Sequence, residues 1–274
     1  MPKHVSNVIE TSPEESVVSA IPVTSFDTDK NVVVITKNGM IKRSKLADFK
    51  LSRYSKPTSC MKLKDDDLVI DAFIEEKDTL FITTDSGYGL TFKTEEVPIV
   101  GVKAAGVKAM KLKDDHVVSI NQYSPLEAEY ISIITDKGTG KRVHLSEFEL
   151  STRARRGLLV LREVKSNPYH VIKTFITDSK NYIGIKNGEI DTLKLTELNI
   201  ADRYSTGGQI SKHELSDSFL IATLQRREEV EQESISTLSD MEEVNVQEKT
   251  VPKKEKISLK EIDDRLMTID DFLK

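Results

Sequence analysis

A repeat of about fifty residues is the feature that most constrains this 274-residue chain. Four segments share one internal order of features; they span residues 32–74, 80–123, 130–174 and 182–224. A glycine follows the first strand-like stretch of each segment, at Gly39, Gly87, Gly138 and Gly188, with spacings of 48, 51 and 50 residues. The string MKLKDD also occurs twice, beginning at Met61 and Met110. Such repeats build arrays in which each unit buries a face against its neighbours.

Each repeat predicts four β-strands. An apolar, β-branched stretch such as Val32–Thr36 leads into a turn such as Asn38-Gly39, a dipeptide that favours a two-residue hairpin with positive φ at both central positions. The turn is followed by a return strand and then by a basic or glycine-rich connector. After the connector come a further strand, an acidic turn and a last strand. The sequence therefore predicts an all-β, propeller-like fold of four-stranded blades.

The repeat divides the chain into four parts. Residues 1–29 match the second half of a truncated preceding blade, with Val17–Val23 as its last strand. The alternative is an N-terminal strand that closes a ring by pairing with the last blade. Residues 30–225 form the four blades. Residues 226–256 predict a disordered acidic linker, and residues 257–274 predict a short amphipathic helix.

Charge is sorted along the chain. The total is −5, yet residues 31–225 carry a net +3 and residues 137–165 a net +5. A local basic face is therefore compatible with an acidic total. A single cysteine, no membrane-length apolar run and no signal peptide predict a cytoplasmic protein without a membrane partner.

No catalytic or metal-binding set emerges from the residues. The five histidines are scattered, and none stands at a metal-ligand spacing beside Cys60. The acidic runs at 65–67 and 114–115 predict solvated turns rather than cation sites. The glycine pairs lack the helix and the Lys-Ser/Thr ending of a phosphate-binding loop.

The block ITKNGMIKRSKLADF at Ile35–Phe49 has echoes in the later repeats, and Arg-Tyr-Ser occurs at Arg53 and Arg203. With these motifs, residues 5–225 resemble the C-terminal β-pinwheel domain of bacterial type IIA topoisomerase A subunits. The gyrase branch carries a Gln-Arg-Arg-Gly-Gly-Lys-Gly box, which is absent here. The string HVSNVIE and the degenerate connectors are more similar to the topoisomerase IV branch of Gram-positive bacteria, with gyrase as the alternative.

The resemblance implies a non-catalytic domain that binds and bends the transported duplex for ATP-dependent strand passage, in decatenation, supercoil relaxation and chromosome segregation. It implies that the domain is joined to the remainder of the A subunit and assembles with the topoisomerase IV B subunit in a heterotetramer. The expected location of this heterotetramer is the nucleoid. Mg²⁺, ATP and the nucleophilic tyrosine belong to other domains or subunits, so no cofactor is expected in this chain. Arg53-Tyr54 and Arg203-Tyr204 lie in connectors and are not expected to be catalytic.

A domain that wraps DNA needs cations along one continuous rim, because phosphate contacts give affinity without recognising sequence. The repeat places basic residues at like positions, and Arg153, Arg155 and Arg156 form the densest group. The predicted DNA-contacting residues are Lys42, Arg43, Lys45, Arg53, Lys103, Lys108, Lys141, Arg142, Arg153, Arg155, Arg156, Arg203 and Lys212. The alternatives are that these are ordinary solvated charges, or that the propeller binds proteins instead.

Overall fold

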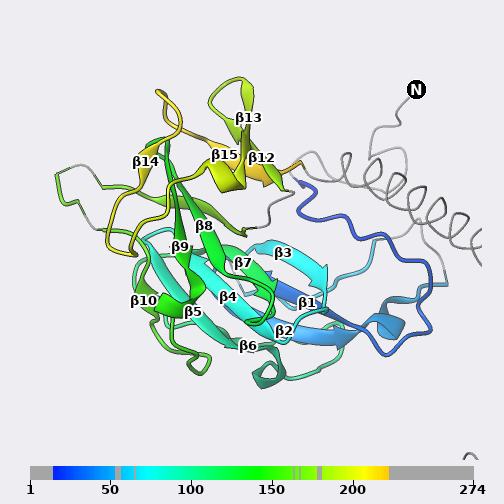
Figure 1. Cartoon of the computed structure of the whole chain (residues 1–274). Coiled ribbons are helices and arrows are strands. Elements are labelled where there is room, and N and C mark those ends of the chain that lie inside the picture. Colours follow the sequence, from blue (N-terminus) through cyan, green and yellow to red (C-terminus); the bar gives the residue numbers. More distant parts are fainter. Residues whose placement is uncertain are drawn as a thin grey trace, which may run out of the picture. The chain divides into compact units, whose positions relative to one another are not determined.

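The computed structural model describes residues 15–52, 57–64, 66–162, 164–166, 168–177 and 181–221, which form successive β-blades (Figure 1). The first blade has the strand order β3-β1-β2-β6. Its hairpin is β1 (Asn31–Thr36) and β2 (Met40–Lys45), its inner strand is β3 (Val69–Ile74), and its outer strand is β6 (Val107–Lys108).

The next two blades repeat this order. Blade 2 consists of β7 (Val117–Tyr123), β4 (Thr79–Thr84), β5 (Tyr88–Lys93) and β10 (Leu158–Leu159). Blade 3 consists of β11 (Val171–Ile176), β8 (Tyr130–Thr135), β9 (Thr139–His144) and β14 (Gly208–Gln209). Blade 4 has three described strands, β15 (Asp217–Leu220), β12 (Tyr182–Lys186) and β13 (Ile190–Lys194). A 3-10 turn follows each hairpin, at η2 (Leu46–Phe49), η3 (Thr94–Glu96), η4 (Leu145–Glu147) and η5 (Leu195–Glu197).

The outer strand of each complete blade comes from the following repeat. β6, β10 and β14 are two-residue strands that pair antiparallel with β2, β5 and β9 of the blade before them. The all-β prediction is confirmed, but four strands do not all form within one repeat. Each connector crosses the outer edge of the preceding blade. Because its strand has only two residues, this strand pairs with that edge and not with its own repeat.

The core lies between successive blades. Val33 and Ile35 of blade 1 pack in one buried cluster with Ile82 and Phe92 of blade 2. Blades 2 and 3 meet in the same way, and the Phe81 ring lies edge-on to a ring of the next repeat. Central strands are therefore covered on both faces, as the six buried residues of β4 show. This explains why their sequences are continuously apolar or β-branched rather than alternating.

The hairpin turns differ from the predicted two-residue type. Gly39 has φ 74°, while Asn38 is not among the residues with positive φ. The Gly39 amide donates to the Thr36 carbonyl at 3.0 Å, so Lys37–Gly39 form a three-residue loop that ends in a left-handed glycine. The glycine was identified for the right conformational reason, but the loop is one residue longer.

The strand predicted over Val17–Val23 is not formed. The Ser19 hydroxyl donates to the Ala72 carbonyl at 2.7 Å, and Ile21, Val23 and Phe26 pack against the apolar cluster of blade 1. This segment therefore covers blade 1 through its side chains rather than by strand pairing with any described residue. The predicted linker 226–256 and helix 257–274 lie outside the described residues. Among the described residues, no helix is long and apolar enough to cross a membrane.

Candidate nucleic-acid interface

Three connectors, each fixed on the edge of the preceding blade, carry six of the thirteen predicted DNA-contacting residues, namely Lys103, Lys108, Arg153, Arg155, Arg156 and Arg203. The connector first runs parallel to the second hairpin strand, as in the Arg43–Ile99 and Arg142–Ile200 bridges. It then turns and returns as the short outer strand. At the turn, Gly157 has φ 82°, and a Cβ there would lie 2.3 Å from the Gly89 carbonyl oxygen. Only glycine lets the connector approach the strand this closely.

Two of the predicted contacts, Lys42 and Lys141, are wrong, because both side chains are buried. Their residues are 0% and 1% exposed. The Lys141 ammonium donates to the carbonyls of Asp202, Arg203 and Ser205 at 2.8, 3.0 and 2.8 Å. Lys42 does the same to the Gly101 carbonyl at 3.1 Å and to a neighbouring carbonyl. These lysines hold the connectors from inside.

Burial also affects the protonation of these two lysines. It lowers the pKa of Lys141 from 10.5 to about 8, and carboxylates nearby oppose the shift only in part. The pKa of Lys42 is lowered as well, chiefly by burial. A sequence pattern that repeats a lysine at one strand position therefore marks a structural group here rather than a phosphate contact.

Arg43 and Arg142 also bind the connectors. The Arg43 Nε donates to the Val97 carbonyl at 2.7 Å, and its Nη1 lies 2.6 Å from a Glu75 carboxylate oxygen. The Arg142 Nε donates to the Leu198 carbonyl at 2.7 Å. Both arginines are part-buried, and each guanidinium group donates at least one hydrogen bond to a connector carbonyl.

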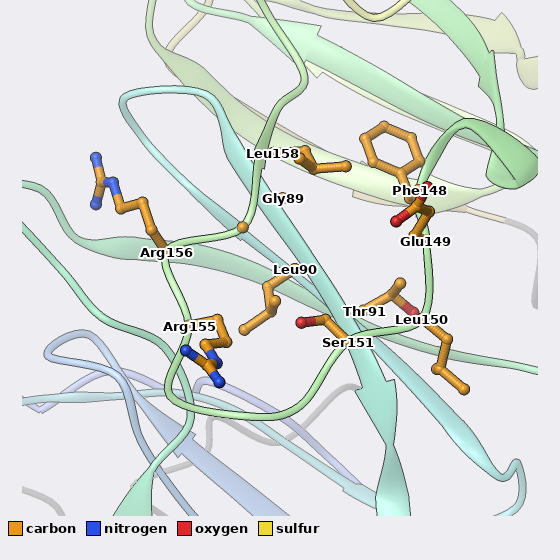
Figure 2. A pocket seen from close by; sticks show the side chains of 11 residues that line it. Gly89, Leu90, Thr91, Phe148, Glu149, Leu150, Ser151, Arg155, Arg156 and Leu158 are labelled. Carbon is orange, nitrogen blue, oxygen red and sulfur yellow. The ribbon is translucent and has the colours of Figure 1, made fainter.

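The arginine group 153–156 divides into different roles. Arg153 donates through Nε to the Glu96 carbonyl at 3.0 Å and through Nη1 to the Lys108 carbonyl at 3.1 Å. Arg155 is exposed. Figure 2 shows that Arg155 and Arg156 leave the loop in different directions. The three residues therefore do not form one phosphate-binding cluster.

Arg156 links two repeats through a buried ion pair. Its Nη1 lies 2.7 and 2.8 Å from the two carboxylate oxygens of Asp115, and its guanidinium lies 3.7 Å from the centre of the Tyr88 ring. The Asp115 side chain is 0% exposed, so the expectation of a solvated turn is wrong at this residue. Burial alone raises the pKa of Asp115, but hydrogen bonds from Arg156, the Lys113 amide and Thr84 outweigh it and hold the pKa below 3.8.

The remaining predicted contacts are accessible to different degrees. Arg203 is part-buried and makes a long contact, 3.5 Å, from Nη1 to the Leu159 carbonyl. Arg53 lies outside the described residues. The exposed residues are Lys45, Lys103, Lys108, Arg155 and Lys212.

The structure adds four exposed lysines that the repeat analysis missed as candidate contacts. They are Lys62, Lys64, Lys111 and Lys113. The Lys62 amide donates to the Ala104 carbonyl at 3.3 Å, and the Lys111 amide donates to the Arg155 carbonyl at 2.9 Å, so each pair adjoins a connector. The signal was in the sequence, because both pairs belong to the repeated MKLKDD string.

These lysines and their neighbours form a surface that we call the basic edge. It consists of Lys62, Lys64, Lys103, Lys108, Lys111, Lys113 and Arg155. Side-chain hydrogen bonds link these segments to the next connector, since the Lys108 and Lys111 carbonyls accept from the guanidinium groups of Arg153 and Arg156. None of the seven forms an ion pair with a carboxylate among the described residues.

The connector of blade 2 also encloses a hollow of about 340 Å³ (Figure 2). Gly89–Thr91 form its floor, and Phe148–Ser151 and Arg155–Leu158 surround it. Leu90 occupies the strand position that Lys42 and Lys141 hold in blades 1 and 3, so this position supplies no ammonium to bind the connector of blade 2.

The part of the chain that the structure describes contains no cluster of three potential metal ligands.

Comparison with known proteins agrees with this architecture. Residues 30–74, 78–123 and 129–177 match the family model of the DNA gyrase C-terminal domain, beta-propeller. The chain is 38% identical over 210 residues to the A subunit of DNA topoisomerase 4 from Bacillus subtilis, covering 76% of this chain and 26% of that protein. It is 30% identical over 212 residues to the corresponding protein of Staphylococcus epidermidis, with the same coverage. The chain thus spans about a quarter of the length of these curated relatives.

Solved structures give the same result. A crystal structure of the C-terminal domain of DNA topoisomerase IV matches with a TM-score of 0.78 at 33% identity, covering 84% of this chain and 75% of that one. A C-terminal domain of DNA gyrase matches with a TM-score of 0.67 at 20% identity, covering 79% of this chain and 74% of that one, which shows a shared fold.

Proposed function

Because the chain belongs to the DNA gyrase C-terminal domain family of beta-propellers, we propose that it binds double-stranded DNA along the basic edge without recognising sequence. The observation that carries this proposal is the set of seven exposed cations on adjoining segments, without ion-pair partners among the described residues. Cations that are not already paired can replace the counterions around phosphates, which is the main source of nonspecific affinity.

The buried cations have a structural role that supports the proposed role of the exposed ones. Lys42, Lys141 and Arg156 fix the connectors on the blades. Fixed connectors present Lys103, Lys108 and Arg155 at constant positions, which limits the entropy lost on binding. A rigid row of cations also favours a bent duplex, since bending lets more phosphates reach the surface.

At the level of the whole enzyme, we infer a role in topoisomerase IV. The similarity to the topoisomerase 4 protein of Bacillus subtilis supports it, and the chain spans 26% of that relative. In this role the domain holds the transported duplex for ATP-dependent strand passage. The nucleophilic tyrosine, Mg²⁺ and ATP are supplied by the B subunit or by the rest of the polypeptide to which this domain belongs. The setting is the cytoplasm, at the nucleoid.

The proposal is tested by fluorescence anisotropy with a labelled duplex of about 40 base pairs at low salt. Lys108→Ala, Lys111→Ala and Arg155→Ala are combined in one variant. Its matched control combines Lys30→Ala, Lys50→Ala and Lys186→Ala, which removes the same charge from exposed positions outside the basic edge.

We expect the basic-edge variant to weaken binding at least about tenfold and the control to change it by less than about threefold. Two duplexes of unrelated sequence should bind with equal affinity, because phosphate contacts carry no sequence information. Equal losses in both variants would mean that net charge alone, rather than this surface, determines binding.

A further inference from the structure

One apolar side chain is exposed at the same position of each of the three connectors. Each lies seven residues before the positive-φ glycine of its connector; they are Ile99, Leu150 and Ile200. Their exposed fractions are 47%, 55% and 51%. A single apolar residue on a surface needs no explanation, but three at one repeat position with nearly equal exposure form a regular feature.

The core does not account for this feature. The residue two positions earlier in each connector is buried and belongs to an apolar cluster between blades; these residues are Val97, Phe148 and Leu198. The three exposed residues belong to none of the apolar clusters that the described residues form. Figure 2 shows that the Leu150 side chain points away from Leu90, which is part of the core. Packing within the fold therefore leaves these side chains available to a partner.

The backbone holds each exposed side chain at a constant place. The next residue of the connector donates its amide to the second hairpin strand, at 2.8 Å from Val100 to Arg43, 2.9 Å from Ser151 to Thr91 and 2.9 Å from Ala201 to Arg142. The outer edges of blades 1, 2 and 3 thus each carry one fixed apolar side chain.

Two of the connectors also carry cations of the basic edge close to these side chains. Lys103 follows Ile99 by four residues, and Arg155 follows Leu150 by five. Both cations are exposed, and neither forms an ion pair with a described residue. Five residues of chain span at most about 17 Å, which is comparable with the combined width of the two DNA grooves, about 18 Å. A duplex whose phosphates contact these cations therefore reaches the apolar side chains as well.

We propose that Ile99, Leu150 and Ile200 pack against the deoxyribose faces of a duplex bound along the basic edge, and that this contact favours a bent duplex. The inference rests on the proposed DNA binding and adds apolar contacts to it. Because the three side chains lie on successive blades, a duplex has to follow the blades to bury all of them, and their burial stabilises the bend. Every nucleotide has a sugar, so the contact requires no particular sequence.

The test measures the affinity of the full chain for a duplex of about 40 base pairs across a range of monovalent salt. Energy transfer between dyes at the two ends of the duplex reports its bending. The test variant combines Ile99→Ala, Leu150→Ala and Ile200→Ala. A conservative variant, Ile99→Leu, Leu150→Ile and Ile200→Leu, keeps the apolar character. The matched control removes exposed apolar side chains outside the connectors, with Val17→Ala, Leu68→Ala and Leu126→Ala.

The alanine variant should bind at least about fivefold more weakly at every salt concentration, because less apolar surface is buried in the complex. It should also give a smaller rise in energy transfer on saturation with protein. Its slope of log affinity against log salt should equal that of the wild type, because no charge is removed. The conservative and control variants should bind within about twofold of the wild type. All four proteins should have the same Tm, since the substituted side chains lie outside the apolar clusters.

An alanine variant that binds and bends the duplex as the wild type does would overturn the inference and leave the proposed DNA binding intact. A reduced salt slope in this variant would also overturn it, because the side chains would then act by positioning cations. Equal losses in the conservative or the control variant would show that the apolar character of these three positions is not what matters. A wild type without salt-dependent duplex binding would remove the proposed function itself, and this inference with it.

Discussion

Replacing the buried lysine of blade 3, Lys141→Leu, separates a structural role from a DNA-binding one. The Lys141 ammonium makes three hydrogen bonds to connector carbonyls. Leucine fits the site, because Leu90 stands at the same position of blade 2. The variant therefore removes the ammonium and its bonds with little steric change.

The expected loss of stability follows from two opposing effects. Hydrogen bonds to a charged group contribute about 1.5–3 kcal/mol each. The cost of burying the ammonium, several kcal/mol, offsets a large part of this gain. We expect Lys141→Leu to lower the free energy of unfolding by about 3 kcal/mol.

Urea denaturation at several pH values measures this difference. The folded-state pKa of Lys141 is about 8 and its ordinary value is 10.5. Between these values the unfolded chain binds more protons than the folded one, so this group's contribution to the free energy of unfolding rises with pH. The leucine variant lacks this group, so the stability difference between wild type and variant should grow from pH 8 towards pH 10.5.

Lys212→Leu, at an exposed lysine, is the control and should change stability by less than about 0.5 kcal/mol. DNA affinity of the folded Lys141→Leu variant should stay within about twofold of wild type, because the ammonium does not reach solvent. A variant as stable as wild type, or a stability difference that does not change with pH, would refute the structural role. A large loss of DNA affinity in the folded variant would restore Lys141 as a phosphate contact.

Three further predictions concern the connector of blade 2. Arg156→Ala should destabilise the chain by about 3 kcal/mol, because it leaves the buried Asp115 carboxylate unpaired, and chemical denaturation measures this. Since the folded pKa of Asp115 is depressed, its stabilising contribution is present above pH 3.8 and is lost as pH falls through the folded pKa, and an acid titration of wild type against Arg156→Ala should reveal that loss. Gly157→Ala should cost more than about 2 kcal/mol through positive φ and a backbone collision, while Gly101→Ala, with nothing within 4 Å, should be near neutral in a thermal melt.

The sequence predicted the repeating blades because their signals are local and periodic. Strand-forming stretches such as Val32–Thr36 and the glycine of each hairpin recur at a fixed period, and the structure places them as expected. The exchange of outer strands could not be predicted in this way. Val107 and Lys108 form only a two-residue strand, and their pairing with Ile41 and Met40 depends on how blades pack, which no local pattern encodes.

The candidate site was predicted less well, because charge in a sequence does not reveal exposure. Lys42 and Lys141 recur at equivalent strand positions, which suggested a common rim, yet their recurrence reflects a common role inside the connector. The sequence predicted that Arg156 belongs to a phosphate-binding group, but its guanidinium pairs with the carboxylate of Asp115, 41 residues earlier. Lys111 lies in a repeated string that the acidic residues identify as a turn, and nothing in the string itself shows that its lysines adjoin the next connector.

The salt dependence of duplex binding tests the central claim most directly. The Kd of the full chain for a duplex of about 40 base pairs should be measured across a range of monovalent salt. If the seven cations of the basic edge contact phosphates, log affinity should fall against log salt with a slope of about −6, and the variant lacking three of them should give a slope of about −3 to −4. A slope near zero, or the same slope in both proteins, would contradict the account.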